Sequence, residues 1–229
     1  MEIYLLRHGV TEWNDLYKIQ GATDIPLNAD GVEMARQTGE YMKENGITFD
    51  AVYSSPLDRA YQSAKMVSGS GNIIKDERLR EMTFGKQEGL SLQELKANDD
   101  IPFKCFKNAP SQYDVLVAAY DPEGESFEEL INRATSFIKE VIEGKEASQE
   151  TEGQKRRILI SGHGALDQAI LFYIRKRENI DEFWKGGLLP NCGIDVIEYD
   201  AASGEYTFAE EMAYYYSKEL FDKSPKLLK

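Results

Sequence analysis

The sequence predicts a single α/β domain in which a mostly parallel, doubly wound sheet has helices on both faces, giving three layers. Short apolar segments of strand length alternate along the chain with segments of helical character, and this alternation is typical of a parallel sheet. The length of 229 residues suits one such domain with a small insertion. In open sheets of this kind, ligands bind outside the carboxyl ends of the strands. A functional site is therefore expected at the strand-to-helix junctions.

The predicted strands are short apolar segments bounded by turn-forming residues. In chain order they cover residues 2–6, 49–55, 72–75, 156–161, 192–200 and 205–211. The last two flank the turn "AASG" and form a closing β-hairpin. The first strand of this hairpin is expected to join the main sheet at its edge.

The predicted helices alternate with these strands. They cover residues 29–44, 56–67, 91–97, 126–144 and 165–176. Asn28 is a suitable N-cap for the first helix, and Pro56 suits the first turn of the second. The fourth helix is long and amphipathic, and Glu125 with Ser126 is expected to form a capping pair at its start.

One stretch, residues 99–123, interrupts the alternation. It is irregular and rich in aromatic residues, so we expect an inserted lid of short helices and loop within a single domain that spans residues 1–229. Selection among substrates is expected to depend on this lid. The aromatic segment 212–221 either packs the C-terminus onto the core or lines a subunit interface, and residues 217–229 are expected to form a solvated tail.

The composition argues against several classes of partner. A formal net charge of −13 repels polyanions, so neither nucleic acid nor an anionic membrane is expected to bind. No apolar run approaches the roughly 20 residues that cross a bilayer, and no signal segment begins the sequence, so a cytoplasmic location is expected. Cys105 and Cys192 lie far apart with no neighbouring histidine, which favours ordinary structural thiols over a disulfide framework or a zinc site.

The chain contains only two histidines, and both lie in the same local pattern. His8 follows the first strand and precedes Gly9, whereas His163 follows the fourth strand between Gly162 and Gly164. A lone histidine after a strand is usually a packed core residue, but this repeated pattern at one sheet edge favours a shared site. The glycines are expected to allow tight turns and the close approach of a ligand.

Two arginines are predicted to lie near these histidines. Arg7 precedes His8, and Arg59 lies in the first turn of the helix after the second strand. Two cations and two imidazoles suit a phosphoryl group, and a helix that begins at Ala165 would direct its free N–H groups toward such an anion. A metal is not expected, because two histidines without a carboxylate cluster are a poor zinc set and the arginines would repel a cation.

Ordered motifs from residue 2 to about residue 199 resemble those of the histidine phosphatase superfamily, which contains the cofactor-dependent phosphoglycerate mutases. The motifs are "LLRHGVTEWN", "QGATDIPLNADGVEMA", "VYSSPLDRAYQSA", "LREMTFGKQEG", "GESFEEL" and "LISGHGA". The resemblance implies a phosphoglycerate mutase-like fold and a covalent phosphohistidine mechanism that uses no metal or other cofactor.

The resemblance also implies roles for five residues. His8 would be the nucleophile, while Arg7, Arg59 and His163 would bind and neutralise the transferring phosphoryl group. Glu81 matches the family's proton donor and would act as general acid and base, although by spacing alone it is equally compatible with an exposed charged loop. These roles suit phosphoryl transfer, which depends on alignment and on stabilising the charge of the non-bridging oxygens.

Further residues are candidates for contacts to the substrate. Asn14 would add a hydrogen bond to the phosphoryl group. Thr11, Gln20, Gly21 and Gly164 are candidates for contacts near the phosphate or the rest of the substrate.

The expected pocket is compatible with more than one activity. A phosphatase of the histidine acid phosphatase type would hydrolyse a small-molecule phosphomonoester, whereas a cofactor-dependent phosphoglycerate mutase would return the phosphoryl group to the substrate and needs extra cations under a closing lid. The lid supplies only Lys104 and Lys107, which favours the phosphatase. A third hypothesis is a non-catalytic phospholigand-binding module. The physiological substrate and the oligomeric state, monomer or homodimer, stay open.

Overall fold

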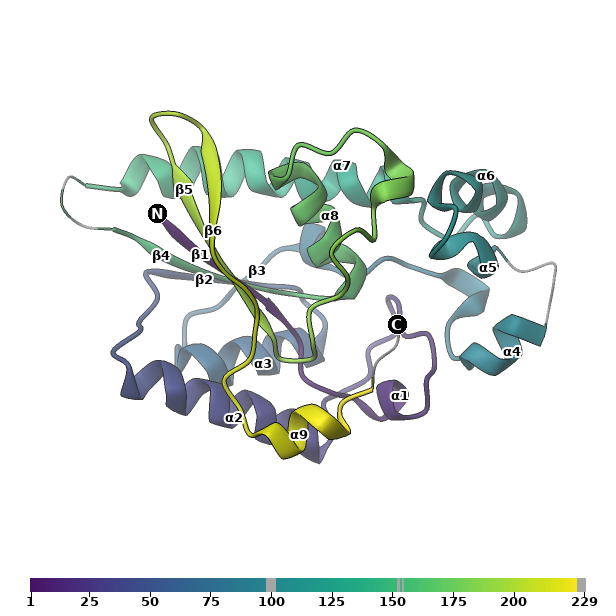
Figure 1. Cartoon of the computed structure of the whole chain (residues 1–229), viewed down its shortest axis with the longest axis horizontal. Helices are drawn as coiled ribbons and strands as arrows, with labels where there is room; N and C mark the ends of the chain where they lie inside the picture. Colours follow the sequence, from purple (N-terminus) through teal and green to yellow (C-terminus); the bar gives the residue numbers. More distant parts are fainter. Residues whose placement is uncertain (98–101, 152, 154, 226–229) are drawn as a thin grey trace.

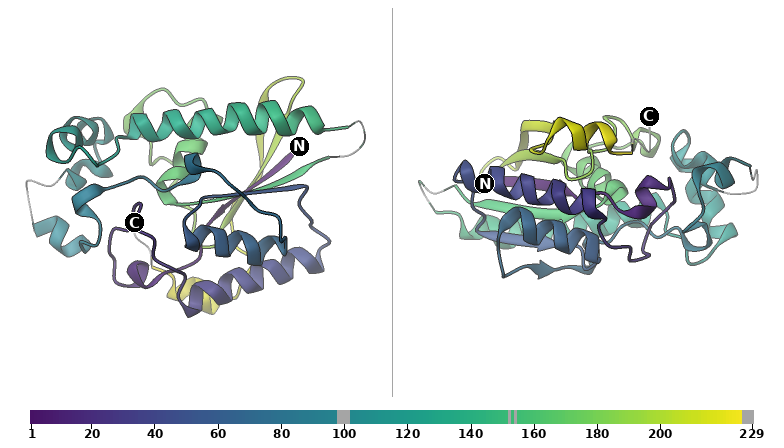
Figure 2. Two further views of the ribbon diagram at one scale, coloured as in Figure 1. Left: turned by 180° about the vertical axis from the view of Figure 1, so that it is seen from behind. Right: turned by 90° about the horizontal axis from the view of Figure 1, so that it is seen from below.

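The computed structural model describes residues 1–97, 102–151, 153 and 155–225, and its centre is a sheet between two layers of helices (Figures 1 and 2). The strands of the described residues are β1 (Glu2–Arg7), β2 (Ala51–Ser54), β3 (Ile74–Lys75), β4 (Arg157–Gly162), β5 (Ile194–Asp200) and β6 (Glu205–Ala213). They are arranged in the order β3-β2-β4-β1-β5-β6.

The described helices lie around this sheet. They are α1 (Glu12–Asp15), α2 (Ala29–Glu44), α3 (Asp58–Ser68), α4 (Leu92–Ala97), α5 (Phe103–Phe106), α6 (Pro110–Tyr120), α7 (Phe127–Phe137), α8 (Gly164–Ile174) and α9 (Lys218–Lys223). Helices α2, α3 and α9 lie on one face of the sheet, and α7 and α8 on the other (Figure 2).

The strand pairings confirm the predicted fold class. Strand β1 pairs in parallel with β4, β4 with β2, and β2 with β3. The closing hairpin adds the antiparallel part, because β5 pairs with β1 and β6 pairs with β5. The first strand of the hairpin therefore extends the parallel part of the sheet, and β6 forms the outer edge.

Burial on both faces explains why the central strands are apolar. Along β1, Ile3 and Leu5 belong to the core cluster that contains residues of α7 and α8. Tyr4 and Leu6 point the opposite way, into the cluster that contains residues of α2, α3 and α9. Because successive side chains of a strand face opposite sides of the sheet, one short strand supports both cores.

The long helix after the lid begins as predicted but continues further. Helix α7 passes directly into a π-helix, η3 (Ile138–Glu146). Ser126 is the N-cap, and its capping-box partner is Glu129 rather than Glu125. The predicted capping pair is thus wrong for Glu125, whose carboxylate pairs with Arg133 at 2.6 Å.

The C-terminal segment differs from the predicted solvated tail, because residues Lys218–Lys223 form α9 and Leu220 is buried. Tyr216 is also buried and donates a hydrogen bond to the Asn191 carbonyl at 2.7 Å. Tyr215 stacks on Tyr41 of α2 with ring centroids 4.2 Å apart. The aromatic segment therefore packs the C-terminus onto the core, while residues 226–229 lie outside the described residues.

Two short helices, α5 and α6, occupy the described part of the predicted lid, and residues 99–101 lie outside the described residues. The two helices lie beyond the edge of the sheet where α8 begins (Figure 1). A contact to the segment after α8 holds α6, because the Ser111 N–H donates to Asp181 at 2.9 Å. The extent of the lid and the single-domain boundary remain predictions.

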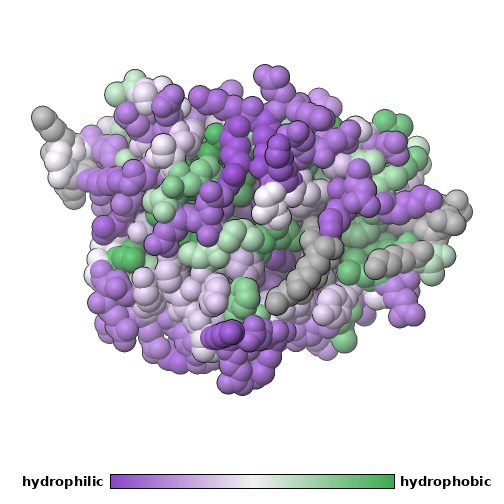
Figure 3. All heavy atoms as spheres, in the orientation of Figure 1, coloured by the Kyte–Doolittle hydropathy of each residue, from purple (hydrophilic) through white to green (hydrophobic). Residues whose placement is uncertain are grey.

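The molecular surface is mostly polar. Hydrophilic residues cover most of the face shown in Figure 3, consistent with the net charge of −13. Within the described residues, no helix combines the length and the apolar character needed to span a bilayer. Cys105 and Cys192 are both free thiols, and Cys192 is buried.

Close packing of α2 on α3 gives a first testable prediction. A Cβ atom added at Gly39 would lie 2.2 Å from the Met66 carbonyl oxygen, and backbone cannot move aside cheaply. We expect Gly39→Ala to lower the free energy of unfolding by about 1–3 kcal/mol, despite the higher helix propensity of alanine. At Gly71 an added Cβ meets nothing within 4 Å, so Gly71→Ala is the matched control. Superimposable urea unfolding curves for the two variants would contradict the close approach.

Candidate active site

Three parallel strands end side by side at the edge of the sheet formed by their carboxyl ends, which is not the outer edge formed by β6. Arg7 of β1 is paired with Gly162 of β4, and Ser54 of β2 with Ser161. Because these strands end together, His8 and His163 follow at neighbouring positions, and their ring centroids lie 5.2 Å apart.

A cavity opens at this edge and contains most of the predicted site residues. Its volume is about 90 Å³, well above the roughly 10–15 Å³ that one water molecule needs. The predicted residues on its wall are Arg7, His8, Asn14, Gln20, Gly21, Arg59, Glu81 and Gly164. His163 and Thr11 are buried and are not lining residues, but the His163 ring lies next to that of His8. No three or more His, Cys, Asp and Glu side chains of the described residues gather as a metal site would require.

The His8 imidazole is held in one tautomer. Its Nδ1–H donates to the Gly9 carbonyl at 2.6 Å, which leaves the Nε2 lone pair for reaction. Burial, followed by the charges of Arg59 and Arg7, holds the pKa of His8 well below its usual value. His8 is therefore neutral at pH 7, the form that a nitrogen nucleophile requires.

The His163 imidazole has the opposite character, because neither ring nitrogen has a hydrogen-bond partner among the described residues. The side chain is fully buried, and burial and the nearby Arg59 charge lower its pKa. Buried polar atoms are normally hydrogen-bonded. Two unpartnered ring nitrogens beside the cavity thus leave His163 able to bind an incoming group.

The two arginines are bound by carbonyl groups and not by carboxylates. Arg7 donates to the Leu189 carbonyl at 2.6 Å, and Arg59 donates to the Thr23 and Gly21 carbonyls at 2.8 and 2.7 Å. No carboxylate of the described residues lies within 4.0 Å of either guanidinium, and both Nε atoms are buried without a partner. Burial lowers the pKa of Arg59 to about 10, so it stays a cation at pH 7. Two buried cations without a direct ion pair favour an anion, even though the Glu81 charge acts on both from a greater distance.

Thr11 orients two amide side chains that line the cavity. Its hydroxyl lies 2.9 Å from Gln20 Oε1 and 3.2 Å from Asn14 Oδ1, and its N–H donates to the same Asn14 oxygen. Both amide oxygens are thereby occupied by protein donors. The amide nitrogens make no hydrogen bond within the described part of the chain, so Asn14 and Gln20 can each offer N–H groups to an anion.

Glu81 lies at the start of α8, where backbone groups hold it. Its carboxylate accepts hydrogen bonds from the N–H groups of Met82, Ala165 and Leu166, at 2.9, 3.2 and 3.1 Å. This corrects the expectation that the Ala165 end of the helix would bind the substrate anion directly. The helix N-terminus instead fixes a carboxyl group at the wall of the cavity.

Two of the neighbouring glycines accommodate protein, not a ligand, which corrects the expectation from the sequence. A Cβ at Gly9 would lie 2.6 Å from the Gly31 carbonyl oxygen, and one at Gly162 would lie 2.4 Å from the Asp167 carboxyl. Of the three glycines beside the histidines, only Gly164 borders the cavity, and a Cβ added there would be 3.6 Å from Glu81.

Sequence reasoning missed the role of Glu88. Its carboxylate accepts hydrogen bonds from the N–H groups of Ala22, Thr23 and Phe84 at 2.9, 2.8 and 3.0 Å, and from the Thr23 hydroxyl. One side chain therefore joins two loops that border the cavity. Glu88 lies within the "KQEG" motif, but nothing in its spacing indicates these partners.

The loop that Glu88 holds in turn holds Arg59. Gly21 and Thr23 supply the two carbonyl groups that accept from the Arg59 guanidinium. Gly21 has a φ of 54°, a conformation that favours glycine. Glu88 thus positions Arg59 without touching the cavity.

Asp167 is a second residue that the sequence did not single out. It is buried on α8, and neither carboxyl oxygen has a hydrogen-bond partner among the described residues. Burial, followed by the Glu81 charge, raises the pKa of Asp167 well above its usual range. A run of apolar residues surrounds it in the sequence, and this was the available signal of a buried acid.

The fold and this site define the class of the protein, a phosphoglycerate mutase-like α/β protein. The structure of Bacillus stearothermophilus YhfR superposes with a TM-score of 0.78 at 28% identity, over 96% of this chain and 98% of that one. The Histidine phosphatase superfamily (branch 1) family model matches residues 3–210. The chain therefore belongs to the histidine phosphatase superfamily.

Named relatives of this chain include both phosphatases and mutases. The Bacillus subtilis protein "Uncharacterized phosphatase PhoE" is 32% identical over 171 residues, 74% of this chain and 75% of the relative. "Probable phosphoglycerate mutase GpmB" of Proteus mirabilis is 32% identical over 201 residues, 87% of this chain and 85% of the relative. Phosphoserine phosphatase of Entamoeba histolytica, in complex with 3-phosphoglyceric acid, superposes with a TM-score of 0.71 at 26% identity, over 96% of this chain and 98% of that one.

Removing the Glu88 carboxylate should impair the site through Arg59. We expect Glu88→Gln to lower kcat/KM for a phosphomonoester by about 10- to 100-fold, because the amide nitrogen cannot accept a hydrogen bond and the loop that orients Arg59 would shift. The thermal stabilisation that inorganic phosphate gives should shrink in parallel. Glu44→Gln, at the exposed end of α2, is the matched control. A purely structural role would lower Tm yet leave the phosphate-induced shift intact.

The buried neutral histidines predict a loss of stability in acid. Unfolding returns each imidazole to a pKa near 6.5, so below that pH the unfolded state binds protons that the folded state does not. For His8 and His163 the free energy of unfolding therefore falls as the pH decreases, until the pH reaches their lowered pKa values. His163→Gln removes one such group. Below pH 6.5, the free energy of unfolding measured in urea should therefore decrease less steeply with falling pH in the variant than in the wild type, by up to about 1.4 kcal/mol per pH unit. Parallel pH profiles for the two proteins would rule this out.

Proposed function

We propose that the protein is a phosphatase that hydrolyses a small-molecule phosphomonoester through a phosphohistidine formed on His8. The observation that carries this proposal is the pair of buried cations, Arg7 and Arg59, that have no carboxylate partner and lie beside a neutral imidazole. A phosphoryl group supplies negative charge in direct contact with both guanidinium groups and an electrophilic phosphorus in one ligand. We therefore infer a phosphomonoesterase of the histidine acid phosphatase type.

In the first half-reaction, the Nε2 lone pair of His8 attacks phosphorus while the bond from phosphorus to the ester oxygen breaks. Arg7, Arg59 and His163 stabilise the charge on the three non-bridging oxygens, and Asn14 adds an N–H donor. Glu81, which takes up a proton when the negatively charged ester binds beside it, gives this proton to the leaving oxygen, so the alcohol departs neutral. The products are the alcohol, a phosphohistidine and the Glu81 carboxylate.

In the second half-reaction, water attacks the phosphohistidine. Glu81 takes a proton from this water as its oxygen bonds to phosphorus, and the bond from phosphorus to Nε2 breaks. Inorganic phosphate leaves, and both His8 and Glu81 return to their initial protonation states. The backbone bonds from Met82, Ala165 and Leu166 support this role because they fix the Glu81 carboxyl group through both steps.

A phosphoglycerate mutase is the second candidate, favoured by the likeness to the GpmB proteins. Such an enzyme needs cations for a second phosphate and for the substrate carboxylate. Beyond Arg7 and Arg59, Lys18 supplies the only further cation on the cavity wall among the described residues. Lys104 and Lys107, the cations of the predicted lid, do not line the described cavity. These observations favour hydrolysis.

A non-catalytic phospholigand-binding module is the third candidate. Loss of the nucleophile or of a cationic residue would support it, but His8, Arg7, Arg59, Glu81 and His163 are all present. Cytoplasmic location, independence of metal and the oligomeric state remain predictions.

The proposal predicts that phosphate release depends on His8. With EDTA present, the wild-type protein should release inorganic phosphate from phosphomonoesters, and His8→Ala should lower kcat by at least about a thousandfold because no covalent intermediate can form. Protein denatured rapidly at alkaline pH, where the bond from phosphorus to nitrogen survives, should carry label from a ³²P-labelled ester on His8. Gly71→Ala serves as a variant with an intact site.

A parallel assay separates the alternatives. Conversion of 3-phosphoglycerate to 2-phosphoglycerate with 2,3-bisphosphoglycerate present, and little phosphate release, would identify a mutase. Phosphate release that persists in His8→Ala would contradict the covalent mechanism.

A further inference from the structure

The cavity extends from the phosphoryl site to a wall of apolar side chains. These come from four separate parts of the chain: the loop after α1, the segment from Glu81 to α4, helix α5 and the segment after α8. The apolar residues that line it include Ile19, Phe84, Leu92, Phe103, Trp184 and Leu188. Several of them are only partly buried by protein, so a ligand can cover their remaining surface.

Backbone hydrogen bonds fix one side of this wall. The Ile19 N–H donates to the Leu90 carbonyl at 3.0 Å, and the Leu92 N–H donates to the Tyr17 carbonyl at 2.9 Å. Ile19 and Leu92 are thereby held side by side.

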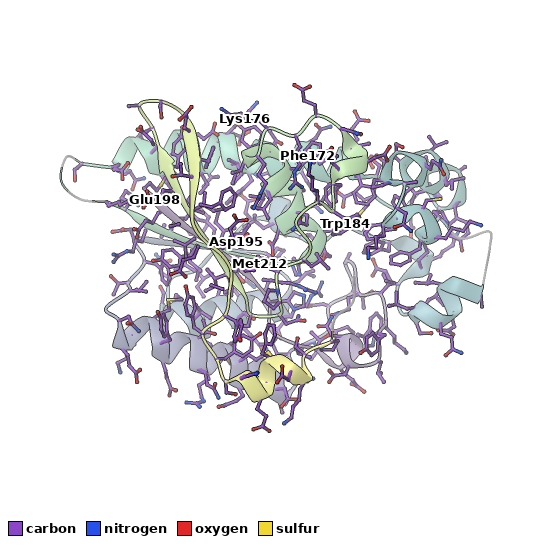
Figure 4. The ribbon with its side chains drawn as sticks, in the orientation of Figure 1. Phe172, Lys176, Trp184, Asp195, Glu198 and Met212 are labelled. Carbon is purple, nitrogen blue, oxygen red and sulfur yellow. The ribbon has the colours of Figure 1, made fainter. Side chains whose placement is uncertain are left out.

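An aromatic cluster fixes the other side. Phe103 stacks on Phe106 with ring centroids 4.8 Å apart, and its ring meets Phe84 edge-on at 6.0 Å. Figure 4 shows Trp184 in the segment after α8, on the side where α5 and α6 lie. The Trp184 Nε1–H donates to the Phe106 carbonyl at 2.8 Å. The one polar group of this cluster is therefore already bonded, and the rings offer carbon surface to the cavity.

The apolar wall carries few charged or polar side chains. Lys18 is the one cation of the described wall outside the phosphoryl site, and its Nζ lies over the Trp13 ring at 5.7 Å. Apart from Lys18 and the residues of the phosphoryl site, no described wall residue offers a polar side chain to a sugar or a second anion. A polyhydroxy leaving group would lose its hydration here without gaining partners, and a carboxylate would meet Lys18 alone.

We infer that the substrate is a phosphomonoester of an apolar alcohol, one that carries an aromatic or branched apolar group. This inference rests on the proposed phosphatase function and adds the chemistry of the leaving group. The phosphoryl group binds at Arg7, Arg59 and His163, and the alcohol covers Phe103, Trp184 and Leu188. Covering this apolar surface favours such esters over polar ones.

The test compares esters whose alcohols have similar acidity, so that leaving-group chemistry does not decide the result. We expect kcat/KM for 2-phenylethyl phosphate to exceed that for ethyl phosphate, glycerol 3-phosphate and 3-phosphoglycerate by roughly 10- to 100-fold. The ratio kcat/KM is the proper measure. All esters form the same phosphohistidine, so kcat is equal for all of them where its hydrolysis is the slow step.

Variants of the apolar wall test whether these residues cause the preference for 2-phenylethyl phosphate. Leu188→Ala and Phe103→Ala should each narrow the ratio of kcat/KM between 2-phenylethyl phosphate and ethyl phosphate several-fold. Leu116→Ala, an exposed position on α6, is the matched control and should keep the wild-type ratio. Because two wall variants are measured, the test still gives a result if one of them does not fold.

The possible outcomes are distinct. Equal kcat/KM values, or a preference for 3-phosphoglycerate that Lys18→Ala removes, would overturn the inference while leaving the phosphatase in place. A wild-type preference that neither Leu188→Ala nor Phe103→Ala alters would also overturn it. Phosphate release from no ester at all would overturn the proposed function, and this inference with it.

Discussion

The parallel pairing of β1 with β4 is the constraint on which the site depends. Register places Arg7 opposite Gly162, so the two strands end together and each is followed at once by a histidine. Because both strands are apolar on both sides and buried between two helical layers, a shift of register would expose core residues on either face. The free energy that orders the core therefore also fixes the distance between the two imidazoles.

The site is stable in its charged state because main-chain groups surround it. Carbonyl oxygens of Gly21, Thr23 and Leu189 hold the arginines, and N–H groups at the start of α8 hold Glu81. Main-chain dipoles of this kind stabilise charge without supplying a mobile counter-ion that would compete with the ligand. The cavity thus offers cationic groups to an anion although the protein as a whole is strongly acidic.

Features that depend on local pattern could be predicted from the sequence, and features that depend on tertiary contacts could not. His8, His163 and Arg59 follow strands, so topology alone predicts that they meet. Glu88 and Trp184 act through residues far away in the chain, and no spacing indicates those partners. Helix α9 was missed because its charged residues are typical of a tail, while burial of Leu220 depends on the aromatic side chains that precede it. The capture of the α8 N–H groups by Glu81 likewise joins segments more than 80 residues apart.

The division of the cavity wall between sheet edge and connecting segments has an evolutionary consequence. The groups proposed to bind the phosphoryl group lie on β1, α3 and the start of α8, within the packed core, whereas the apolar wall comes from loops and short helices attached to it. Those loops can accumulate substitutions without disturbing the core, because loops tolerate sequence change that packed elements do not. The same set of reactive residues can in this way serve related proteins with different substrates. A superfamily that includes both hydrolases and mutases is the expected outcome.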